Sequence, residues 1–102
     1  MNYSVRRDDR HRITADIRVA TADGRELALS AIDLSRGGIG TDGLMQFYAE
    51  QPVRVTFPDG TTKTGWTMWH EDFSAGILFD EALSEDRLAA LLHSLAQVPR
   101  FR

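Results

Sequence analysis

The sequence contains no cysteine and no long run of apolar residues. The absence of cysteine excludes disulfide bonds, thiolate metal ligands and a cysteine nucleophile, and it fits a reducing compartment. Because no stretch of about 18 apolar residues occurs, the sequence predicts no membrane-spanning helix. The arginines near the N-terminus are not followed by an apolar segment, so a secretory signal is not expected either. We therefore expect a cytoplasmic protein.

Lysine is almost absent, since Lys63 stands alone against eleven arginines, and the net charge is −3. Non-specific binding of DNA or RNA needs an excess of cationic side chains over a large surface, so the composition argues against it. An arginine offers a planar fork that binds a phosphate through two hydrogen bonds and stacks on rings. GC-rich coding would produce the same bias toward arginine. The composition thus leaves room for a local anion site only.

Motifs of catalysis are missing as well. Ser35 lies in a glycine-containing loop, but the G-x-S-x-G spacing of a nucleophile elbow is not present. The three histidines are scattered, and His70-Glu71-Asp72 is more typical of a solvated strand end than of a metal site. No pair of carboxylates stands out as an acid–base couple. The sequence predicts neither an enzyme nor a metal-binding protein.

Short segments of alternating polarity dominate the 102 residues, a length that suits one domain. Asp-Gly pairs at residues 23–24 and 59–60 are strong turn signals between them. We expect strands at residues 13–19, 27–31, 37–41, near Phe47, and at 53–57, 61–70 and 76–79. Short strands at such spacing predict a small barrel or sandwich.

The period changes to that of a helix at about residues 84–97. Ser84 is a good N-cap, and the acidic residues that follow it suit the first turn. Leucines at positions 88, 91, 92 and 95 fall on one face of this helix. That face is expected to pack on the strands or on a partner.

Two polar stretches carry the most chemical information. Residues 5–13 (VRRDDRHRI) hold four arginines, of which Arg6 and Arg10 have the spacing R-x-x-x-R. After a strand, a turn and a second strand comes the loop Asp33-x-Ser35-x-x-Gly38. An aspartate accepts hydrogen bonds from a nucleobase edge or holds an arginine, a serine hydroxyl donates to phosphate, and glycine lets a ligand approach the backbone. Each stretch alone would be an ordinary charged arm or a tight turn.

Taken in this order and spacing, the two stretches resemble the PilZ domain family, bacterial receptors for the second messenger cyclic di-GMP. The segments 65–69 (GWTMW) and 76–79 (GILF) are similar to that family's glycine- and tryptophan-containing strand pair. The likeness covers nearly the whole chain. It implies an all-β fold, a small six-stranded antiparallel β-barrel with a C-terminal α-helix over residues 13–102, preceded by a flexible arginine arm at 1–12.

The resemblance implies a single-domain cyclic di-GMP receptor in which the arm closes over the ligand and changes a surface that binds an effector protein. In this family the arginines would grip phosphate oxygens and stack on guanine, while the loop would meet a guanine edge. The alternative is a PilZ-like adapter that binds protein and no nucleotide. The candidate ligand-binding residues are Arg6, Arg7, Arg10, Asp33, Ser35, Gly38 and Trp69.

Two details of this assignment stay open. The family arm often reads R-R-x-x-x-R, and a second register would use Arg7 and Arg12 in place of Arg6 and Arg10. Trp69 is a candidate ligand contact, but a tryptophan in a strand of a small barrel usually packs in the core. Trp66, three residues earlier and therefore on the opposite face, is expected to be more exposed.

Overall fold

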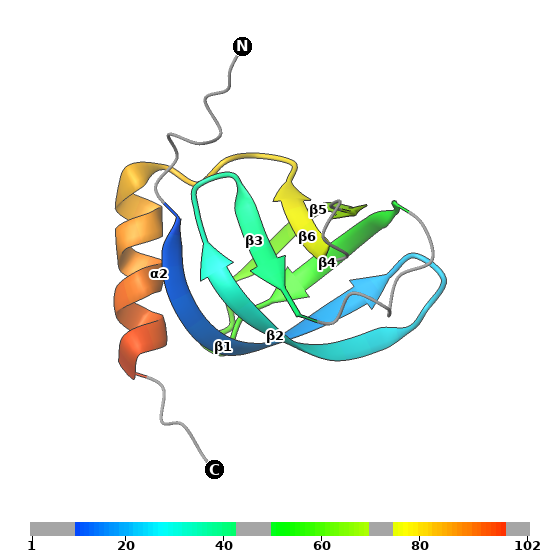
Figure 1. Ribbon diagram of the computed structural model, residues 1–102, viewed down its shortest axis with the longest axis horizontal. Helices are drawn as coiled ribbons and strands as arrows, with labels where there is room; N and C mark the ends of the chain where they lie inside the picture. Colours follow the sequence, from blue (N-terminus) through cyan, green and yellow to red (C-terminus); the bar gives the residue numbers. More distant parts are fainter. Residues whose placement is uncertain (1–9, 43–49, 70–74, 98–102) are drawn as a thin grey trace.

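A closed barrel of six antiparallel strands, followed by one helix, makes up the structured part of the chain (Figure 1). The structure, a computed structural model, describes residues 10–42, 50–69 and 75–97. Around the barrel the strands are ordered β1-β2-β3-β6-β5-β4, and every neighbouring pair is antiparallel. The expected fold class is confirmed. The elements are β1 (His11–Thr21), β2 (Glu26–Leu34), β3 (Gly38–Thr41), β4 (Pro52–Thr56), β5 (Thr62–Trp69), β6 (Ala75–Phe79) and α2 (Glu85–Gln97).

The first strand begins earlier than the alternation of apolar residues predicted. His11 and Arg12 already belong to β1, where they pair with the end of β2. Pairing with a neighbouring strand extends β1 past the last buried position, and single-strand alternation cannot reveal this. Residues 1–9 and the strand expected near Phe47 lie outside the described residues.

Both Asp-Gly turns form where the sequence predicts them. Gly24 and Gly60 have φ angles of 94° and 93°, which lie in the left-handed region that favours glycine. The Gly24 amide donates to the carbonyl of Thr21 at 3.1 Å, and the Gly60 amide donates to that of Phe57 at 2.9 Å. These turns connect β1 to β2 and β4 to β5.

The core follows from the alternation along the strands. On β1, Ile17 and Val19 are buried, while Asp16 and Arg18 between them are exposed. Strands β1, β2, β3, β4 and β6 contribute in the same way to one cluster inside the barrel. Burying a side chain of this size contributes roughly 1.5–3 kcal/mol, so the cluster is the main source of stability. Its members from the strands and the residue after β4 are Ile17, Val19, Leu29, Ala31, Leu34, Ile39, Val53, Val55, Phe57, Ile77 and Phe79.

Helix α2 packs on the barrel through its leucine face. Of the two expectations, packing on the strands or on a partner, the first is confirmed. Ser84 caps the helix, because its hydroxyl accepts a hydrogen bond from the Arg87 amide at 3.1 Å. Leu88 and Leu91 join the core cluster, and Leu92 packs against its edge. In Figure 1 the helix stands beside β1. Among the described residues, no helix has the length and apolar character needed to cross a bilayer.

A polar contact also connects α2 to the turn between β4 and β5. The carboxylate of Asp59 accepts a hydrogen bond from the Thr61 amide at 2.9 Å. Burial raises the pKa of Asp59, but the hydrogen bonds from Thr61 and from the Ser94 hydroxyl outweigh it, so the pKa lies below its ordinary value of 3.8. The ionised carboxylate is therefore the form that the folded state favours.

This contact predicts a pH-dependent effect of Asp59→Asn. Because the folded-state pKa of Asp59 is depressed, its carboxylate stabilises the fold above pH 3.8, and this contribution is lost as the pH falls through the folded-state pKa. We expect the variant to be modestly less stable than wild type at pH 7 and equal to it under strongly acidic conditions. Urea unfolding at both pH values measures this. A stability difference that is the same at the two pH values would contradict the prediction.

Candidate functional site

Three segments that are far apart in sequence meet at one end of the barrel. They are the start of β1, the turn between β2 and β3, and the linker from β6 to α2 (Figure 1). His11 pairs with Leu34, the last residue of β2, and the Leu83 amide donates to the carbonyl of Arg36 in the turn at 2.8 Å. The described end of the first motif, which begins at Arg10, therefore lies next to the D-x-S-x-x-G loop.

Irregular strand pairing gives Asp33 its position in this region. The register between β1 and β2 shifts between Arg12 and Ala15, and the register between β2 and β3 shifts between Ala31 and Asp33. Shifts of this kind mark bulges, which bend a strand and re-aim the side chains next to them. Ile32 is 39% exposed, and the side chain of Asp33 is 25% exposed, so both are accessible from outside the barrel.

An ion pair links the two motifs. Nη1 of Arg10 lies 3.3 Å from Oδ2 of Asp33, in hydrogen-bonding geometry. The Arg10 side chain is 56% exposed, so most of the guanidinium is free to contact a second group. An exposed pair of this type contributes at most about 1 kcal/mol to stability. Its more important role is to hold the guanidinium group of Arg10 in a fixed position beside Asp33.

Beside Asp33 the outer wall of the barrel lacks side chains. Gly40 on β3 pairs with Asp33 on one side and with Gly76 on β6 on the other. Residues that pair directly across antiparallel strands point to the same face, so these two glycines continue the row that Asp33 begins. We call Gly40 and Gly76 the glycine strip. Two strand spacings make the row about 10 Å wide. The Asp33 carboxyl group itself lies over Gly40, and Gly76 is buried, so the part of this row that a ligand can reach is the carboxylate.

Ser35 and Gly38 close the turn between β2 and β3. The Ser35 amide donates to the carbonyl of Gly38 at 2.9 Å, and the Ser35 hydroxyl lies 3.4 Å from the same oxygen. That second bond is long, so the hydroxyl can exchange it for a ligand at small cost. The φ angle of Gly38 is not in the left-handed region, although a tight turn would suggest it. Glycine is needed there because an added Cβ would lie 2.2 Å from the carbonyl oxygen of Ile77.

The turn is fastened to the linker that precedes α2. Nε of Arg36 donates to the carbonyl of Leu83 at 2.8 Å, and the Leu83 amide donates back to the carbonyl of Arg36 at the same distance. The Phe79 amide donates to the carbonyl of Gly37 at 2.8 Å. The turn is therefore held in place from the side of β6 and α2, and its conformation does not depend on β2 and β3 alone.

We expect Arg36→Ala to lower the free energy of unfolding by about 1 kcal/mol, because it removes a charged donor from a partly buried carbonyl. Urea denaturation followed by tryptophan fluorescence measures the change. Arg54→Ala is the matched control, since Arg54 is an exposed arginine on β4, and it should stay within about 0.5 kcal/mol of wild type. Equal effects of the two substitutions would show that the Arg36 bond contributes nothing specific.

Of the residues singled out in the sequence, the structure brings Arg10, Asp33, Ser35 and Gly38 together. Arg6 and Arg7 lie outside the described residues. The backbone of Trp69 pairs with that of Ala75, and the side chain of Trp69 lies outside the described part of the structure. Trp66 is 47% exposed, as expected, and pairs with Leu78, which is 55% exposed.

Sequence reasoning missed the glycine strip. Arg12, which the second register of the arm would use, pairs with Asp33 through the backbone of β1. The spacing Gly38-x-Gly40 was a usable signal, because residues two apart in a strand share a face. The contribution of Gly76 could not be read, since it depends on which strand lies next to β3.

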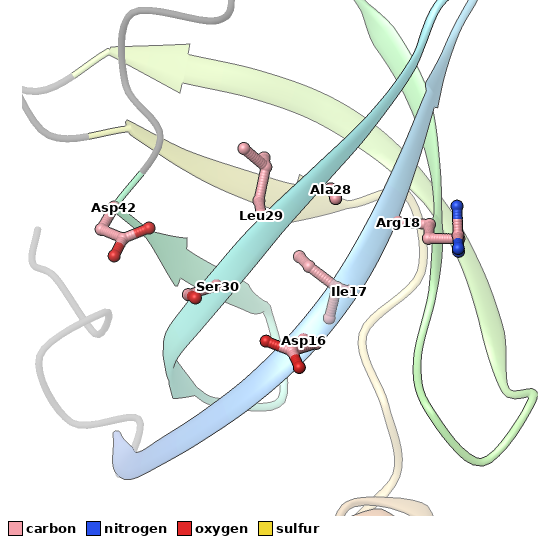
Figure 2. A pocket seen from close by; sticks show the side chains of 7 residues that line it. All are labelled: Asp16, Ile17, Arg18, Ala28, Leu29, Ser30 and Asp42. Atoms are coloured by element: carbon pink, nitrogen blue, oxygen red, sulfur yellow. The ribbon is translucent and has the colours of Figure 1, made fainter. Parts of the chain in front are cut away.

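A separate groove lies between β1, β2 and the residue after β3 (Figure 2). Its volume is about 440 Å³. Asp16, Ser30 and Asp42 lie near one another in it, whereas Arg18 projects apart from the two carboxylates. Carboxylates repel phosphate, so this groove does not suit an anionic ligand. Within the described ranges no cluster of His, Asp or Glu suited to a metal ion is found.

Comparison with known proteins supports the fold. No protein family model and no curated protein sequence matches the chain. Among solved structures, the Bacillus subtilis inhibitor of motility, MotI/DgrA, is similar, with a TM-score of 0.54 and 11% sequence identity over 97% of this chain. The chain spans about half of that protein, 54% of its length. At this identity the likeness extends to the fold alone.

Proposed function

We propose that this chain is a PilZ-type receptor for cyclic di-GMP that signals through a partner protein. The observation that carries the proposal is the ion pair between Arg10 and Asp33, set beside the glycine strip and the Ser35 hydroxyl. The sequence motifs that resemble the PilZ family support it independently. A fold shared with a protein that inhibits motility favours a regulatory role over an enzymatic one.

The chemistry of the ligand matches the groups gathered here. Cyclic di-GMP carries two phosphate charges and two flat guanine bases. In the proposed complex Asp33 holds Arg10 by one nitrogen, and the remaining donors of the guanidinium bind a phosphate. A guanine edge meets the Asp33 carboxylate, and Ser35 donates to a polar atom of the ligand. Each charged hydrogen bond contributes about 1.5–3 kcal/mol.

In this proposal Arg6 and Arg7 supply further contacts to phosphate, and Trp69 supplies a ring contact to the ligand. Closing of the N-terminal arginines over the ligand alters the surface at this end of the barrel, which an effector protein then recognises. When the entropic cost of ordering these residues is subtracted from the energy of the contacts, the binding free energy is roughly −8 to −9 kcal/mol, which corresponds to micromolar to submicromolar affinity. The acidic groove around Asp16 is expected to repel the phosphates, and this favours the end of the barrel around Arg10 and Asp33 as the binding surface.

Titration calorimetry with cyclic di-GMP tests the proposal. We expect saturable binding, and chemical-shift changes in an NMR titration for Arg10, Asp33, Ser35 and the glycine strip. Cyclic di-AMP serves as a control for recognition of the guanine edge and should bind more weakly. An absence of heat and of shift changes at millimolar ligand would reject the receptor and favour the adapter that binds protein only.

A further inference from the structure

We infer that Gly40 is a positioning residue, whose missing Cβ lets the carboxylate of Asp33 lie over β3 where it meets Arg10. The inference rests on the proposed function for its consequence in ligand binding. The position of the Asp33 carboxylate over Gly40 is a property of the protein without ligand. Gly40 lies outside both sequence motifs, since it follows the D-x-S-x-x-G loop by two residues.

The space above Gly40 is already filled by the aspartate. A Cβ built on Gly40 would lie 2.8 Å from Oδ2 of Asp33 and 2.9 Å from Oδ1. Oδ2 is the oxygen that pairs with Nη1 of Arg10. Both oxygens thus sit closer than a methyl group allows, so the rotamer that forms the ion pair is open only because residue 40 has no side chain. The strand pairing of Asp33 with Gly40 fixes this juxtaposition.

The nature of the atoms that would clash determines what an added methyl group does. At Gly40 the nearest atoms are all of the Asp33 carboxyl group, the far end of a side chain that can rotate. At Gly38 the nearest atoms belong to the backbone of β6, which cannot move without opening the barrel. Gly40→Ala therefore keeps the fold and moves the carboxylate, so that Arg10 loses its partner.

The test is a double-mutant cycle measured by calorimetry with cyclic di-GMP. We expect Gly40→Ala to weaken binding about tenfold, as for the loss of one charged contact. In an Asp33→Ala background the same substitution should have no further effect, because the group it displaces is gone. Gly24→Ala is the control for the loss of a glycine elsewhere: its φ of 94° makes alanine strained and should lower stability, but the turn lies at the other end of β2, so binding should equal wild type.

Weakening by Gly40→Ala that is equally large in the Asp33→Ala background would overturn the inference, as would binding of Gly40→Ala at wild-type strength. If the wild-type protein fails to bind cyclic di-GMP, the proposed function is rejected, and the inference is decided without ligand. The ¹³Cγ resonance of Asp33 and the side-chain N–H resonances of Arg10 should then shift in Gly40→Ala and stay unchanged in Gly24→Ala. Unchanged resonances in both variants would reject the positioning role.

Discussion

Replacing Asp33 with alanine is expected to weaken cyclic di-GMP binding at least tenfold. The substitution removes the acceptor that holds Arg10 at 3.3 Å, and it removes the carboxylate that faces the glycine strip. Loss of a hydrogen bond that involves a charged group costs about 1.5–3 kcal/mol, and tenfold in affinity corresponds to about 1.4 kcal/mol. Calorimetry of the variant against wild type measures the ratio.

Asp16→Ala is the matched control for this substitution. Asp16 is an exposed carboxylate on β1 in the acidic groove, so its removal changes the net charge by the same amount. Binding should be unchanged, or slightly tighter because a negative charge is gone. Similar weakening by both substitutions would mean that the ligand senses net charge and not the Asp33 site.

Arg10 and Asp33 should act as a unit. Arg10→Ala alone is expected to weaken binding by a similar factor, and the double variant should be little worse than either single one, because the two side chains share one contact. Full additivity of the two effects would show that each residue contacts the ligand independently. The holding role assigned to Asp33 would then be wrong.

How far the sequence determined these expectations varies from residue to residue. The alternation that buries Ile17 and Val19 is local, and the Asp-Gly turns are local too, so most strands and these turns were predictable. Local pattern left a barrel or a sandwich open, and only the resemblance to the PilZ family implied the barrel. Ser84 and the leucine spacing likewise fixed the helix. The start of β1 was not predictable in this way, because His11 is placed by its pairing with Leu34 and not by burial.

The site depended on more than local pattern. The motifs indicated Arg10, Asp33 and Ser35, but the bulge that aims Asp33 outward is a property of three strands in register. Gly76 becomes part of this row only because it pairs with Gly40 across 35 intervening residues, and Arg36 reaches Leu83 for a similar reason. Contacts of this range are set by topology, which a single sequence reveals only through resemblance to a known fold.

The largest effect on stability is expected from Gly65→Ala. A Cβ at Gly65 would lie 2.2 Å from the carbonyl oxygen of Leu78, and a Cβ at Gly38 would lie 2.2 Å from that of Ile77. Two successive carbonyls of β6 are thus approached by a glycine from β5 on one side and from β3 on the other. The close approach of these strands requires that neither position carry a side chain.

Because both clashes are with backbone, an alanine at position 65 can be accommodated only by separating β5 from β6. We expect the free energy of unfolding to fall by about 3 kcal/mol, the upper part of the range for overpacking, and the midpoint of thermal unfolding to fall by roughly 10–20 °C. Calorimetric or circular-dichroism melting measures this. Thr64→Ala, at the exposed neighbouring position on β5, should change the midpoint by only a few degrees. A Gly65→Ala midpoint within that same range would mean that β5 and β6 can separate at little cost and that their close approach does not require glycine at position 65.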